Sequence, residues 1–143
     1  MTQADKDLLL KDLCARLPYG VKAYVRNWSK LDRRYYEGTY TVASIHPSLN
    51  DILVTSDKFS VEVILGYDDY EIKPYLFPLS SMTEEQKREL YNLVEETAFQ
   101  IIHSEDGNPQ PHIAMDWYNK NHFDYRGLIP MGLANDATGL NIY

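Results

Sequence analysis

Apolar residues follow a helical spacing at both ends of the chain and a strand-like spacing in the middle. Near the N-terminus, Leu9, Leu13 and Leu17 recur every four residues, which predicts an amphipathic helix from about Gln3 to Leu17. Thr2 can cap the start of this helix, and a proline and a glycine follow its end. We therefore expect the first segment to pack a leucine stripe against another element.

The middle of the chain is rich in Val, Ile, Tyr and Thr and is divided by turn residues. Alternating apolar and polar positions predict half-buried strands. Short turns favour an antiparallel meander because parallel strand pairs need long crossovers. Pro74 favours an edge position for the last strand, since proline lacks a backbone donor. The expected strands are residues 21–28, 38–45, 52–55, 59–65 and 71–77.

Helical spacing returns after the strands. An apolar stripe predicts a long helix from about Glu84 to Ile102, and Thr83 with Gln86 fits a capping box at its start. The segment Asp106–Pro111 is rich in residues that break helices. A shorter helix is expected after it, from about Ile113 to Asn121.

The C-terminal part of the chain contains seven consecutive residues without a polar side chain, Leu128–Ala134. Because such a segment is costly to expose, we expect it to pack on its own domain or on a partner subunit. The preceding segment, Asp116–Arg126, is dense in residues that both pack and hydrogen-bond. A ligand wall is one interpretation. We favour a docked terminal helix with Trp117 and Phe123 as its apolar contacts.

These elements define an α+β fold in a single domain spanning residues 1–143. We expect an N-terminal helix, a five-stranded antiparallel sheet that can curl into a barrel-like form, two C-terminal helices and a packed tail. The length of 143 residues suffices for one hydrophobic core, and 44% hydrophobic with 24% charged residues is a globular composition. We therefore expect the chain to fold without a disulfide or a metal.

Charge and cysteine content restrict the setting and the partners. The single cysteine and the absence of a long apolar run predict a cytoplasmic protein with no membrane contact. The 14 basic and 21 acidic residues give a net charge of −7, which repels phosphate backbones, so we do not expect duplex nucleic acid as a partner.

The positive charge is nevertheless concentrated. The segment Lys22–Arg34 holds five basic residues and one acid, a local charge of +4, and the remaining nine basic and twenty acidic residues sum to −11. Cations beside aromatic rings suit a ligand that carries phosphate and a heterocyclic base. The alternative is an ordinary exposed sheet face, which we regard as the more frequent origin of such a pattern. The candidate ligand-binding residues are Lys22, Tyr24, Arg26, Trp28, Arg33 and Arg34.

Signals of catalysis and of metal binding are weak, so we assign no catalytic residue, no metal ligand and no cofactor. His46 matches half of a paired phosphoesterase motif, but no second copy follows. His103, Glu105 and Asp106 have the chemistry of a divalent-cation site, although a solvated helix end explains them as well. Cys14 lies on or beside the leucine stripe, where a thiol behaves as a small hydrophobe. The lack of motifs favours binding over catalysis.

Three segments carry a resemblance to a known family: Leu8–Val21, Lys73–Glu85 and Asn119–Ile129. They resemble uncharacterised small proteins encoded by bacteriophages and prophages of gut bacteria. The resemblance covers the two ends of the chain and the join after the predicted sheet, and it brings no assigned activity or catalytic residue. It implies a protein of the bacterial host cytoplasm that serves as an accessory factor.

The sequence thus leads to three hypotheses. The first is a non-enzymatic accessory protein that sequesters a nucleotide-like, phosphate-bearing small molecule, as in counter-defence. The second is a protein–protein binder of a host factor, or a homo-oligomer formed through the Leu128–Ala134 tail. The third is phosphoester hydrolysis through His46, or through a metal at His103, Glu105 and Asp106, and is the one we favour least.

Overall fold

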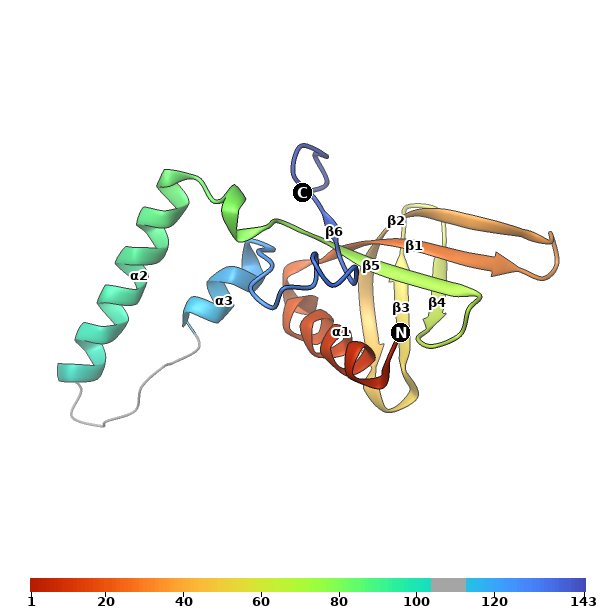
Figure 1. The fold of residues 1–143 in the computed structure, drawn as a ribbon, viewed down its shortest axis with the longest axis horizontal. Helices are drawn as coiled ribbons and strands as arrows, with labels where there is room; N and C mark the ends of the chain where they lie inside the picture. Colours follow the sequence, from red (N-terminus) through yellow and green to blue (C-terminus); the bar gives the residue numbers. More distant parts are fainter. Residues whose placement is uncertain (104–112) are drawn as a thin grey trace.

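The chain forms a sheet with one helix packed under it and two helices to its side (Figure 1). The structure, a computed structural model, describes residues 1–103 and 113–143, and of residues 97–103 only the backbone. The α-helices are α1 (Gln3–Arg16), α2 (Glu84–His103) and α3 (Ile113–Lys120). Short 3₁₀ turns are η1 (Leu17–Tyr19), η2 (Pro47–Leu49) and η3 (Leu79–Ser81). The strands are β1 (Lys22–Ser29), β2 (Arg34–His46), β3 (Asp51–Thr55), β4 (Ser60–Ile64), β5 (Tyr70–Leu76) and β6 (Asn135–Asp136).

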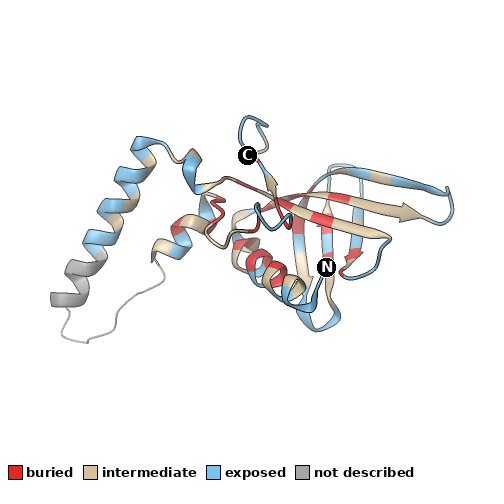
Figure 2. Ribbon diagram, in the orientation of Figure 1, coloured by how far each residue is buried: buried red, intermediate tan, exposed pale blue. Residues whose placement is uncertain are grey.

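The first helix forms where the leucine spacing predicts it. The Thr2 hydroxyl accepts a hydrogen bond from the Asp5 amide at 3.1 Å, and the Asp5 carboxylate accepts one from the Thr2 amide at 2.8 Å, so a capping box starts α1. Leu9 and Leu13 are fully buried against the sheet. Helix α1 therefore covers one face of the strands, as Figure 2 shows.

The sheet is open and mixed, with strand order β4-β3-β2-β1-β5-β6. The first five strands pair antiparallel, as predicted. The expected meander holds only for β1 to β4, because β5 pairs with β1 rather than with β4. The expected five-stranded, barrel-like sheet is wrong in two respects, because β6 adds a sixth strand parallel to β5 and the sheet does not close. Strand β6 is two residues long, too short for a periodic signal. The expected edge position of β5 holds only in part, because β5 lies between β1 and β6. Strand β6 pairs only with Tyr75 and Leu76, so Pro74 has a strand neighbour on the β1 side alone.

Strands β1 and β2 form a ribbon that extends beyond their neighbours (Figure 1). Strand β2 begins at Arg34, four residues before its predicted start, and it pairs with β1 down to Ser29. Its partner β3 begins to pair with β2 only at Thr41. The outer part of the ribbon is not buried on either face, so it lacks the alternation on which the prediction depended.

The core consists of two apolar clusters. The larger lies between α1 and the strands. The smaller joins Leu76 of β5 to Leu128, Leu133 and Ala134, all of them buried. The tail segment Leu128–Ala134 therefore packs on its own domain, which leaves few of its apolar residues for a contact between subunits.

The long helix α2 projects away from the sheet and is exposed over most of its described surface (Figure 2). Its start is the expected capping box, since the Gln86 amide donates to the Thr83 hydroxyl at 3.1 Å and the Thr83 amide to the Gln86 side chain at 2.9 Å. Helix α3 also forms at its expected place. The helix-breaking segment Asp106–Pro111 lies outside the described residues.

Candidate functional site

Four of the six candidate ligand-binding residues share one face of β1. Lys22, Tyr24, Arg26 and Trp28 alternate with Ala23 and its neighbours on the buried side, so they point to the outer face of the sheet, away from α1. This alternation confirms the predicted strand face. Strand β1 rises about 3.3 Å per residue, so Lys22 and Trp28 are separated by roughly 20 Å.

The densest part of this outer face is a cluster of Arg26, Trp28 and Tyr35. Tyr35 pairs with Trp28 across β1 and β2, with ring centroids 4.8 Å apart in an edge-to-face arrangement. The Arg26 guanidinium carbon lies 4.8 Å from the centroid of the Tyr35 ring. Tyr35 remains 49% exposed. A planar ligand can therefore reach an aromatic surface that the protein already holds in place.

Two cations share one carboxylate beside this cluster. Glu71 of β5 lies 3.2 Å from Arg26 and 3.0 Å from Lys73, and all three side chains are partly exposed. Such pairs contribute little to stability because water screens them. An incoming anion that displaced Glu71 would meet both cations. The sequence did not point to Lys73, although alternation along β5 puts it on the same face as Glu71.

Tyr24 is engaged within the sheet. Its hydroxyl donates to the Glu37 carboxylate at 2.7 Å. This hydrogen bond, with burial and the nearby negative charge, raises the pKa of Tyr24 to about 12. The phenol therefore stays protonated at neutral pH, and Tyr24 borders the cluster as a neutral ring.

The other candidate residues lie elsewhere. Arg34 is one residue out of phase with Tyr35, so it points to the opposite face of the ribbon, where its guanidinium lies 4.5 Å from the Tyr36 ring. Arg33 lies in the turn, with a left-handed φ of 52°. Lys22 donates to the Ile142 carbonyl at 2.8 Å at the far end of β1. The six residues thus lie in four places rather than in one site.

A hollow of about 390 Å³ adjoins Arg26 and Glu71. Tyr67, Asp68 and Tyr70 are among its other lining residues. It extends the polar surface from the cluster toward the loop between β4 and β5. Its volume falls in the range of small-molecule sites.

The weaker candidates gain no support from the geometry. His46 is the exposed last residue of β2, 3.7 Å from Asp51. A side-chain hydrogen bond to Asp51, together with the negative charge of Asp51, raises the pKa of Glu62. Within the described ranges no group of three His, Cys, Asp or Glu side chains could hold a metal ion. The His103 side chain, Glu105 and Asp106 lie outside those ranges.

Cys14 departs from its expected environment. It is exposed on α1 rather than packed with the leucines. Partial desolvation raises the pKa of its thiol, so the nucleophilic thiolate is a minor form at neutral pH.

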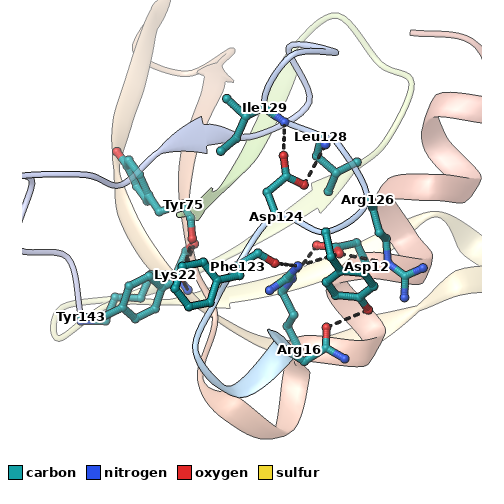
Figure 3. Close-up of polar contacts among 12 residues, drawn as sticks. Asp12, Arg16, Lys22, Tyr75, Phe123, Asp124, Arg126, Leu128, Ile129 and Tyr143 are labelled. Carbon is teal, nitrogen blue, oxygen red and sulfur yellow. Dashed lines mark hydrogen bonds and ion pairs between the residues drawn. The ribbon is translucent and has the colours of Figure 1, made fainter. Parts of the chain in front are cut away.

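The sequence did not reveal a buried ionic network between α1 and the C-terminal tail, here residues 121–143 (Figure 3). Asp12 and Arg16 are fully buried and form two hydrogen bonds, at 2.8 and 3.1 Å. Arg16 also donates to the Phe123 carbonyl at 2.7 Å, and Arg126 donates to Asp12 at 3.2 Å. The network joins α1 to the tail, and its burial indicates a structural role.

His122 lies beside this network in a strained backbone conformation. Its φ is 59°, and its ring stacks on Tyr143 with centroids 3.7 Å apart. Burial, together with the positive charges of Arg16 and Lys22, lowers the pKa of His122 to about 4. The folded chain therefore holds this imidazole neutral at pH values where an unfolded histidine is already protonated.

Acidification is expected to destabilise the fold through His122. Because its pKa is lower in the folded than in the unfolded chain, stability falls as pH drops from about 6.5 to about 4. The ring is not fully desolvated, so we expect the free energy of unfolding to fall by about 1–2 kcal/mol, which is less than the free energy equivalent to the whole pKa shift. Urea unfolding at several pH values measures it. His122→Asn, which tolerates the positive φ, should lose less stability over this range, and an unchanged pH dependence would contradict the assignment.

Comparisons with protein-family models, with curated proteins and with solved structures find no match to this chain. Among the described residues, no helix is long and apolar enough to cross a membrane. The function must therefore be argued from the outer-face cluster and its surroundings.

Proposed function

We propose that this chain is a phage or prophage accessory protein that acts by binding, and that it sequesters a nucleotide-like, phosphate-bearing small molecule in the host cytoplasm. The ligand would lie on the outer face of the sheet, over Arg26, Trp28 and Tyr35. The observation that carries the proposal is this cluster, in which one cation and two rings are held together while Tyr35 stays 49% exposed. We regard the phage setting as an implication of the family resemblance.

The chemistry divides between the rings and the cations. A heterocyclic base would stack on Tyr35 or Trp28, since every base offers a π-face to an aromatic side chain. A phosphate would compete with Glu71 for Arg26 and Lys73, which lie 3.2 and 3.0 Å from that carboxylate. Arg34 is directed to the other face of the ribbon, so we leave it out of this site.

Truncation of a ring should weaken binding. Because stacking contributes about 1–3 kcal/mol per base, Trp28→Ala and Tyr35→Ala should each lower the affinity by roughly fivefold to a hundredfold. Calorimetric titration against a panel of linear and cyclic nucleotides measures this. Tyr91→Ala is the matched control, because Tyr91 is a 62% exposed tyrosine on α2, away from the cluster.

The outcome also separates this function from the alternatives. Absence of heat with every nucleotide, or an equal loss in the Tyr91→Ala control, would remove the proposal. Retention of a host protein by the immobilised chain would then favour the second hypothesis, a protein–protein binder. Turnover of a phosphoester that depends on His46 would favour the third.

A further inference from the structure

The turn between β1 and β2 forms an exposed tip, residues 30–33, at one end of the molecule (Figure 1). Leu31 at this tip is 92% exposed. Asp32 is held locally, accepting hydrogen bonds from Tyr36 at 2.6 Å and from Ser29 at 3.2 Å. Lys30 and Arg33 have no ion-pair partner among the described side chains. The tip therefore presents an exposed leucine together with two cations and one acid, a net charge of +1.

A hollow of about 250 Å³ is lined by residues of η3, the start of α2 and the C-terminal tail. Helix α2 and η3 lie at the end of the molecule away from the tip (Figure 1). Its lining residues include the aromatic Phe77 and Phe123 and the polar Thr83, Gln86 and Thr138. For comparison, a cavity of about 150 Å³ lined by apolar side chains accepts benzene. The hollow thus has room for a branched aliphatic side chain and polar groups around it.

The charges beside the hollow complement those of the tip. Glu84 and Glu85 form the first turn of α2, next to the lining residues Thr83 and Gln86. Glu84 lies 3.0 Å from Lys87 in an exposed pair, whereas Glu85 has no ion-pair partner in the part of the chain that the structure describes. The chain beside the hollow thus carries two acidic residues, and the tip carries a net positive charge.

We propose that the chain self-associates head to tail, with Leu31 of one copy seated in the hollow of the next and Lys30 and Arg33 facing Glu84 and Glu85. A single exposed leucine is ordinary on a protein surface. The tip and the hollow complement each other in shape and charge, and both belong to this chain. This supports a second copy of the chain as the partner of the tip. The two surfaces differ, so the contact is heterologous and builds open chains or rings rather than a closed two-fold dimer.

The contact involves one hairpin turn and one hollow, so we expect it to be small, weak and dependent on concentration. Sedimentation velocity over a series of concentrations tests it. The average mass should rise above 16.6 kDa with concentration and should fall back as salt screens the exposed charges. A mass of 16.6 kDa at every concentration would overturn the proposal.

Two variants test the two surfaces separately. Leu31→Glu removes the apolar side chain and cancels the net positive charge of the tip, and it should weaken association roughly tenfold or more. Thr138→Trp fills the hollow from an exposed position and should act similarly. Leu49→Glu is the matched control, because Leu49 is 67% exposed in a different turn, and it should associate as the natural chain does. Association of Leu31→Glu at the natural strength would overturn the proposal.

Mixing the variants distinguishes a head-to-tail contact from any symmetric one. The Leu31→Glu chain keeps its hollow, and the Thr138→Trp chain keeps its tip. Each alone should remain a monomer, whereas an equimolar mixture should form a complex of two chains and grow no further. If the natural chain self-associates but the mixture does not, the two surfaces do not pair with each other and the proposal is contradicted.

Discussion

Replacing Asp12 with alanine is expected to lower the free energy of unfolding by about 3–5 kcal/mol, the cost of leaving a buried charge without its partner. Asp12 and Arg16 are fully buried, and Arg126 also donates to the same carboxylate. Arg16 would keep only its hydrogen bond to the Phe123 carbonyl. Because natural domains are stable by roughly 5–15 kcal/mol, this single change brings the chain close to unfolding.

Urea denaturation measures this loss of stability, and two further variants show whether it arises from the buried ion pair. Asp7→Ala removes an exposed acid from the same helix and should change stability by no more than about 0.5 kcal/mol. The double variant Asp12→Leu with Arg16→Met replaces the pair by apolar side chains and should recover much of the loss. A cost for Asp12→Ala as small as that of Asp7→Ala would show that the network does not hold the tail to α1.

Phe123→Ala is expected to cost a similar amount, about 3–5 kcal/mol, because it empties a site in the middle of packed rings. Phe123 is 2% exposed, its ring stacks on Trp117 with centroids 5.5 Å apart, and Phe77 packs on it at 6.2 Å. The loss of the stacked ring should also change the fluorescence of Trp117.

The matched control is Phe59→Ala. Phe59 is 53% exposed and packs its ring on Tyr40 with centroids 6.0 Å apart. The same substitution there should cost far less, since less apolar surface leaves water when the chain folds. Thermal or urea unfolding of both variants measures the difference, and equal losses would contradict the central place of Phe123 in the tail contact.

Periodicity and capping predicted most of the regular elements. The capping boxes at Thr2 and Thr83 formed as expected, because they depend on side chains three residues apart. The start of β2 was missed because the outer ribbon has no buried face, and β6 because a two-residue strand has no period. Closure of the sheet depends on strand twist and register, which local spacing does not determine.

The buried ion pair was missed although a signal was present. Leu9, Asp12, Leu13 and Arg16 occupy positions i, i+3, i+4 and i+7, so the two charges lie on the apolar stripe itself. The pair was missed because an i,i+4 pair of charges is more often exposed to solvent. The Phe123 carbonyl that accepts a hydrogen bond from buried Arg16 lies 107 residues away, beyond the reach of a local pattern.

Prediction of the candidate site was similarly partial. Alternation placed Tyr24, Arg26 and Trp28 together on one face, and the structure confirms that arrangement. The register of β2 against β1, which decides the side of Arg34, was out of reach of a local pattern. Lys73 and Glu71 join the cluster through β5, more than forty residues along the chain.

The network between α1 and the tail also bears on the order of folding. Arg16 and Asp12 pair with each other, but the tail groups that bind them lie 107 and 114 residues later in the chain, at Phe123 and Arg126. Chains grow at about 5–20 residues per second during synthesis, so α1 waits for seconds before Phe123 and Arg126 emerge. Through that interval its charged pair lacks the groups that later enclose it. We therefore expect the sheet to form first and α1 to dock in a late step, when the N-terminal helix and the C-terminal tail come into contact.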